Sequence, residues 1–198
     1  MKPILFNTEM VQAILDGRKK VTRRIMKPQP LFKTSRKYIF ADETCPKKFE
    51  DCNNIFDVYQ YKVGDILYVR ETWCKIDDLP FDNYVYRTDY GTTEDDSFPP
   101  SMHKWKPSIH MPKEAARIFL KVTDVRVERL QDITEMQVRK EGFRDYLAAD
   151  DTFYPCGYYF RQTWDSTIKK QDIDKYGWEA NPWVWVIAFE RVGKPDEN

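Results

Sequence analysis

The sequence predicts an α+β fold, in which short helices pack around a small mixed β-barrel. Strand-like patterns outnumber helical ones, and the helical stretches are short and scattered between the strands. The chain has 198 residues, of which 41% are hydrophobic and 15% aromatic. That length is sufficient to bury a substantial core, so we expect a single domain over residues 1–198.

The chain is predicted to begin with a strand, a helix and a second strand. PILF reads as a short strand, and Thr8 is a suitable N-cap for a helix of about two turns. Gly17 would end this helix as its C′ residue. VTRRI, residues 21–25, follows as a strand that places Thr22 and Arg24 on the same face.

The middle of the chain contains two irregular regions. Residues 27–62 are interrupted by prolines and show no persistent period, which indicates a loop-rich insertion. VGDILYVRETW predicts a turn and a strong strand, and NYVYRT predicts a further strand. Residues 91–112 form a long irregular connection, and such connections often carry function.

The second half has clearer patterns. RIFLKVTDVRVERL alternates as a strand, with a bulge expected near Thr123–Asp124. DITEMQVRKEG has Thr134 and Gln137 at capping-box spacing and Gly142 as the stop of a helix. YYFRQTWDSTIKK reads as a helix, and PWVWVIAF as a closing strand.

Composition excludes several classes of protein. The formal net charge is zero, which argues against bulk binding to long duplex DNA. No apolar run is long enough for a membrane helix and the N-terminus lacks a secretory leader, so we expect a cytoplasmic protein that contacts no membrane. Four cysteines without a C-x-x-C pair and two histidines predict reduced thiols, no metal and no cofactor. A metal site that joins Cys45, Cys52 and a histidine is the less supported alternative.

The stretch GRKKVTRR, residues 17–24, concentrates five basic residues in a neutral chain. Basic runs are usually solvated surface, and the pattern alone favours that interpretation. The alternative is a site in which neighbouring cations lower the pKa of Lys19, so that Lys19 acts as a base and activates Thr22. In that case the other basic residues would bind an anionic ligand.

Three further parts of the sequence stand out. Glu141 closes a predicted helix at the end where the helix dipole disfavours a carboxylate. Glu71 lies between Arg70 and Trp73 in a strand, where a buried Arg–Glu pair is favoured over a binding role, and Trp73 belongs either to the core or to a base-stacking site. Ser108 and His110 lack an orienting acid, so His110 is expected to be structural or to contact substrate.

The basic stretch fits the signature G-x-K-x-x-[E/T]-x-R, with Gly17, Lys19, Thr22 and Arg24 at the specified positions. On this basis the chain resembles the ASCH domain family of PUA-like barrels, which is associated with RNA. VGDILYVRETW, SIHMP and VTDVRVERLQDITEMQVRKEGF look like further blocks of its longer phage and bacterial members. The resemblance covers most of residues 2–192.

Threonine at the sixth signature position is also found in the bacterial N4-acetylcytidine amidohydrolases of this family. The resemblance therefore implies a catalytic set of Lys19, Thr22 and Glu141, although this chain is longer than those enzymes. We expect Glu141 to lie within a direct or water-mediated hydrogen bond of Lys19 or Thr22. Substrate contacts are expected from Arg23, Arg24, Arg70, Glu71, Trp73 and His110.

The same resemblance leaves two alternatives open. One is a non-catalytic module that binds single-stranded RNA or a nucleotide through a basic groove, with Trp73 or Trp105 stacking a base. The groove would consist of Arg18, Lys20, Arg23 and Arg24. The other alternative is an ASCH-type ribonuclease. A nucleoside or single-stranded RNA is thus the expected partner, and no stable protein partner is predicted.

Overall fold

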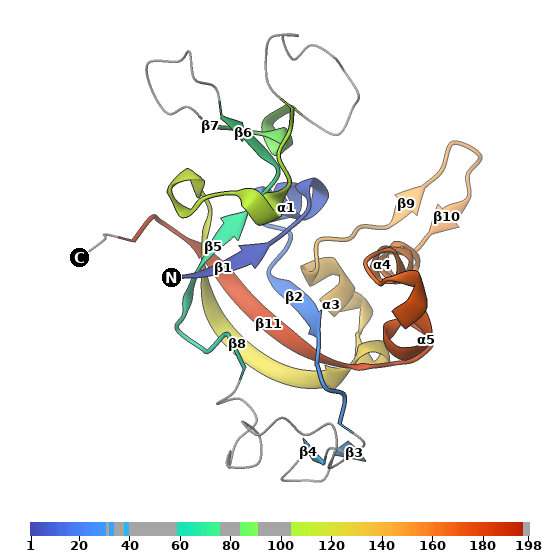
Figure 1. The fold of residues 1–198 in the computed structure, drawn as a ribbon. Coiled ribbons are helices and arrows are strands. Elements are labelled where there is room, and N and C mark those ends of the chain that lie inside the picture. The colour runs from blue at the N-terminus through green and yellow to red at the C-terminus, as the bar shows by residue number, and fades with distance from the viewer. Residues whose placement is uncertain (31, 34–37, 40–58, 76–83, 91–103, 196–198) are drawn as a thin grey trace.

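The computed structural model describes residues 1–30, 32–33, 38–39, 59–75, 84–90 and 104–195. Its centre is a five-stranded mixed sheet in the order β1-β5-β8-β11-β2 (Figure 1). β1 runs parallel to β5, and the other neighbours are antiparallel. The five strands are β1 (Lys2–Leu5), β2 (Val21–Ile25), β5 (Ile66–Arg70), β8 (Phe119–Arg129) and β11 (Trp183–Val192).

Short helices and small strand pairs surround this sheet, which confirms the α+β class. The strand pairs are β3 (Phe32–Lys33) with β4 (Tyr38–Ile39), β6 (Trp73–Lys75) with β7 (Tyr84–Tyr86), and β9 (Tyr146–Leu147) with β10 (Phe153–Tyr154). The α-helices are α1 (Thr8–Leu15), α3 (Glu135–Lys140), α4 (Cys156–Ser166) and α5 (Ile173–Tyr176). Short 3₁₀ turns are η2 (Arg87–Tyr90), η3 (Ser108–His110), η4 (Lys113–Ala115), η5 (Leu130–Asp132) and η6 (Lys170–Asp172).

The backbone hydrogen bonds of the described strands form an open sheet and not the closed barrel that the sequence predicts. β1 and β2 are its two edges. Side chains, and not the backbone of β2, bond carbonyls of β1: Tyr61 Oη donates to Pro3 O at 2.7 Å, and Arg24 Nη2 donates to Leu5 O at 2.7 Å. The sheet therefore curls so that its two edge strands approach each other. The Arg24 side chain of β2, and not a backbone hydrogen bond, connects β2 to β1.

β11 is buried on both faces because helices cover the sheet from both sides. Val184 and Val186 pack with residues of α3 and α4. Ile187 and Phe189, which point to the opposite face, pack with Val11 of α1. The alternation along β11 thus separates two hydrophobic cores, with α1 on one side and α3–α5 on the other.

The predicted bulge in β8 is confirmed. Ala188 lies opposite Asp124, whereas the next residue, Phe189, lies opposite Val122. Thr123 is therefore the extra residue on β8, and an extra residue of this kind bends a strand and increases its twist. The bulge contributes to the curl of the sheet.

The ends of α1 and α3 agree with the sequence except at one cap, whereas the helix predicted over residues 158–170 begins at Cys156 and ends at Ser166. The N-cap of α1 is Asn7 and not Thr8, because the Asn7 side chain accepts the Met10 N–H at 2.8 Å and Thr8 is already helical. Gly17 follows α1 with a φ of 72°, as its predicted C′ position requires. The capping box of Thr134 and Gln137 is present at the start of α3.

Most of the predicted insertion at 27–62 and of the irregular connection at 91–112 lies outside the described residues, as do Cys45 and Cys52. Cys74 and Cys156, which the structure does describe, are both buried. Across the described part of the chain, every helix is too short or too polar to cross a membrane.

Candidate functional site

The C-terminal end of α3 docks on the basic turn after α1. Lys20 N donates to Lys140 O at 2.7 Å, and Arg18 Nη1 donates to Gly142 O. Gly142 has a φ of 102°, and a Cβ at this position would lie only 2.8 Å from Cβ of Ala13. Glycine is therefore required here both by the backbone conformation and by the close approach of α1.

This docking buries an ion pair between Lys19 and Glu141. Lys19 Nζ lies 2.7 Å from Glu141 Oε2 and also donates to Glu141 O at 3.0 Å. The Lys19 side chain is 0% exposed and that of Glu141 is 4% exposed. The predicted contact is present, and it explains a carboxylate at the end of α3, because the ammonium group neutralises both the carboxylate and a terminal carbonyl.

Arg23 holds the second oxygen of the same carboxylate. Its Nη1 donates to Glu141 Oε1 at 3.0 Å, and its Nη2 lies 3.2 Å from both Glu128 Oε2 and Gln137 Oε1. The Arg23 side chain is 1% exposed. Arg23 therefore does not belong to a solvent-exposed groove for phosphates; it fixes the orientation of Glu141.

The pKa of Lys19 is lowered, mainly because burial disfavours the ammonium form. Glu141 opposes this effect through its charge and hydrogen bond, and the cations Arg24 and Arg23 contribute smaller decreases. The direction agrees with the sequence-based expectation. The dominant cause is desolvation and not the neighbouring positive charges.

This lowered pKa predicts a pH dependence of stability. Between the folded-state pKa of Lys19 and its ordinary value of 10.5, the unfolded chain binds more protons than the folded chain, so the free energy of unfolding should rise with pH. Urea titrations from neutral pH upward should show a smaller rise in Lys19→Met than in the wild type. Lys20→Met removes an exposed neighbour and should keep the wild-type slope; equal slopes in all three proteins would contradict the prediction.

A cleft lies along the free edge of β2, between α1 and α4. Its inner part is a pocket of about 50 Å³ that Thr22, Arg24 and Glu141 line together. Thr22 and Arg24 therefore open onto the same space, as their shared strand face predicts. The remaining lining residues are Met10, Arg23, Phe143, Phe160, Thr163, Trp164 and Thr167.

The outer part of the cleft is a pocket of about 330 Å³, which lies within the size range of small-molecule sites. It shares Met10, Glu141, Phe143 and Thr163 with the inner pocket, so the two adjoin. Its other lining residues are Asn7, Glu9, Ala13, Arg18, Gly142, Arg144 and Tyr159.

The three predicted catalytic residues differ in whether they line this cleft. Glu141 lines both pockets and Thr22 lines the inner one, whereas Lys19 lines neither. Lys19 therefore reaches a bound molecule only through a partner, and its contacts make Glu141 that partner. Arg24 is half-buried, with its guanidinium 5.3 Å from the centroid of the Phe6 ring.

Glu71 is part of a separate buried cluster. Arg117 donates to it from Nε at 2.9 Å and from Nη2 at 3.1 Å, and Thr88 Oγ1 lies 3.0 Å away. Glu71 is thus paired with an arginine, as the sequence favours, but this arginine is Arg117, whose side chain is 29% exposed. Arg70 instead donates from Nε to Met111 O at 2.8 Å.

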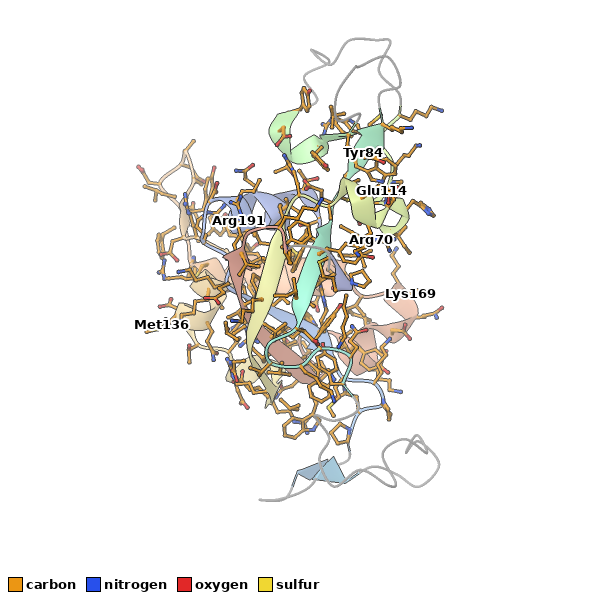
Figure 2. All side chains as sticks on the ribbon, turned by 90° about the vertical axis from the view of Figure 1, so that its left-hand side faces the viewer. Arg70, Tyr84, Glu114, Met136, Lys169 and Arg191 are labelled. Atoms are coloured by element: carbon orange, nitrogen blue, oxygen red, sulfur yellow. The ribbon has the colours of Figure 1, made fainter. Side chains whose placement is uncertain are left out.

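Trp73 and His110 also lie apart from the cleft. Trp73 is buried in a core cluster, with Tyr84 and Lys106 against its ring, so its face is not open to a base. His110 is exposed on η3. Figure 2 shows Tyr84 on the side of the molecule away from Met136 of α3. Neither pocket of the cleft is lined by Arg70, Glu71, Trp73 or His110.

Sequence reasoning missed the walls of the cleft. Met10 comes from α1, Phe143 follows α3, and Tyr159 and Thr163 come from α4. The last two are four residues apart in a stretch correctly predicted as helical, so they share one helix face. This four-residue spacing is the feature of the sequence that indicates a shared position for Tyr159 and Thr163.

Within the described ranges, the structure has no group of three His, Cys, Asp or Glu side chains arranged to hold a metal ion. The chain matches no protein-family model and no curated protein. A solved structure that it resembles is the crystal structure of protein EF3133 from Enterococcus faecalis V583, of the family DUF984. The two share 10% sequence identity, over 100% of this chain and 85% of that chain, with a TM-score of 0.46. A likeness at this level carries no inference about function.

Proposed function

We propose that this chain is a cytoplasmic, PUA-like protein of the ASCH type that removes an acyl group from a modified nucleoside such as N4-acetylcytidine. One observation carries the proposal: a buried Lys19–Glu141 pair lies at the base of a ligand-sized pocket, beside Thr22. A buried lysine with a lowered pKa next to a cleft is typical of acid–base chemistry.

Each residue then has a defined chemical role. Thr22 Oγ1 attacks the acyl carbonyl, and Glu141 relays the hydroxyl proton to the unprotonated form of Lys19, a form that burial makes more accessible than in an exposed lysine. Glu141 delivers a proton to the exocyclic nitrogen, the C–N bond breaks, and the nucleoside leaves with a free amino group. Water then hydrolyses the acyl-threonine ester, which releases the carboxylic acid and regenerates the hydroxyl group.

The surrounding arginines support this chemistry. Arg23 holds Glu141 Oε1, which fixes the orientation of the carboxylate while Oε2 contacts Lys19. Arg24 uses Nη2 to bond Leu5 O and lines the inner pocket, so its remaining N–H groups can stabilise the oxyanion that forms on the acyl carbonyl.

An assay with purified protein tests the proposal. Incubation with N4-acetylcytidine should release cytidine, which chromatography separates from the substrate. Lys19→Ala should abolish the release, whereas Lys20→Ala, which removes an exposed neighbour, should retain it. The absence of release above the Lys19→Ala background, across a series of acylated nucleosides, would reject the proposal.

A non-catalytic module for RNA or a nucleotide is the second candidate. It is favoured by the position of Lys19, which lines neither pocket of the cleft. Binding without turnover in the same assay would support this candidate, and salt-dependent affinity would identify phosphate contacts. Fragments of labelled RNA would instead indicate a ribonuclease.

A further inference from the structure

Four tyrosines form a continuous cluster where the β9–β10 hairpin meets the start of α4. The ring centroids of Tyr158 and Tyr159 are 5.4 Å apart, and those of Tyr154 and Tyr158 are 5.2 Å apart. Tyr146 joins the cluster with a centroid 6.1 Å from that of Tyr159. These contacts are tilted or edge-to-face, so none of these ring pairs is stacked in parallel.

This tyrosine cluster connects the candidate cleft with another pocket. Tyr159 lines the outer part of the cleft, whereas Tyr154 and Tyr158 line a separate pocket of about 570 Å³. That second pocket is rich in aromatic rings. Its other lining residues are Gln131, Ile133, Glu135, Val138, Phe153, Pro155, Gly157, Phe160, Arg161 and Trp178.

Several aromatic side chains of the β9–β10 hairpin and of α4 are exposed to solvent. Tyr146 is 52% exposed, Phe153 61% and Tyr158 44%. Figure 1 shows the hairpin extending away from the central sheet beside α4. Adjacent exposed aromatic side chains of this kind mark binding surfaces in soluble proteins.

We propose that the tyrosine cluster stacks the bases that flank the nucleotide held in the cleft, and that the second pocket receives one of them. The substrate is then an acylated nucleotide within single-stranded RNA and not a free nucleoside. This inference rests on the proposed function. The position of Tyr159 in the wall of the cleft is its central observation, because a polymer that leaves the outer pocket on the side of α4 would contact these rings.

The chemistry of the surface favours a nucleic acid over a protein partner. Its exposed rings can stack against bases of any sequence. Arg161 lies 4.7 Å from the Trp178 ring centroid at the second pocket, where Glu135 is also a lining residue, and Arg144 lines the outer part of the cleft together with Glu9. Each end therefore has a cation that can contact a phosphate. Asp150 and Asp151 lie in the turn of the hairpin. Because their carboxylates repel phosphates, we expect an RNA backbone to follow the base of the hairpin and α4 instead.

The test compares two substrates and two matched variants. A short single-stranded RNA with one central N4-acetylcytidine should have a kcat/KM about tenfold above that of free N4-acetylcytidine. Replacing Tyr146 and Tyr158 together with alanine should remove that advantage and leave the free-nucleoside rate unchanged. Tyr158→Phe keeps the ring and should retain the advantage, as should Ile109→Ser, which removes an exposed apolar side chain on η3.

A binding measurement separates this inference from the proposed function. Fluorescence anisotropy of a labelled, unacetylated RNA of the same sequence should show about tenfold weaker binding in the double alanine variant. That result without any hydrolysis would reject the proposed function and support the stacking surface. Hydrolysis with equal kcat/KM for RNA and nucleoside, or RNA binding that is unchanged in the double variant, would overturn the inference.

Discussion

Replacing Glu141 with alanine is expected to lower the free energy of unfolding by about 3–5 kcal/mol, the range for breaking one partner of a buried ion pair. The substitution leaves the Lys19 ammonium and the Arg23 guanidinium buried without the carboxylate that contacts both. Lys19 is fully buried, so water cannot replace the lost partner without a change in structure.

Urea unfolding monitored by circular dichroism measures this effect. Glu179→Ala removes an exposed carboxylate and should change stability by less than about 0.5 kcal/mol. The double variant Lys19→Met with Glu141→Gln should lose less stability than the sum of its single variants, because it removes both charges of the pair. A cost below about 1 kcal/mol for Glu141→Ala would show that the pair is not held in a water-excluded position.

Replacing Thr22 with alanine is expected to reduce kcat/KM for N4-acetylcytidine by at least about 10³-fold, because the acyl group loses its nucleophile. Thr22 is 2% exposed and lines the inner pocket with Glu141, so the loss should appear in the chemical step more than in binding. Thr22→Ser keeps the hydroxyl group and should retain most of the activity.

Single-turnover measurement of cytidine release, with circular dichroism to verify folding, checks this prediction. Thr123→Ala alters an exposed threonine in the β8 bulge and serves as the matched control, with activity within about twofold of the wild type. A folded Thr22→Ala protein with full activity would exclude Thr22 as the nucleophile. It would favour attack by a water molecule that Glu141 activates.

The features that the sequence predicted well depend on short-range interactions. The strand at 21–25 and the bulge near Thr123 are visible in the local alternation of residues, and the capping box of α3 depends on hydrogen bonds between near neighbours. The N-cap of α1 was misplaced by one residue, because Asn7 and Thr8 are both suitable caps and only the backbone conformation separates them.

The pairing of Lys19 with Glu141 was expected from a family resemblance, and the residues alone suggested only that Glu141 was unusual. By itself, the sequence determined the class of fold, the strand that carries Thr22 and Arg24, and the glycine stops that flank Lys19 and Glu141. Tertiary structure alone decided that Arg23 is buried against Glu141, that Arg117 pairs with Glu71, and that the sheet of the described strands is open. The physical reason is that burial and long-range ion pairing depend on which surfaces dock, and no local period in the sequence encodes a contact between groups more than a hundred residues apart.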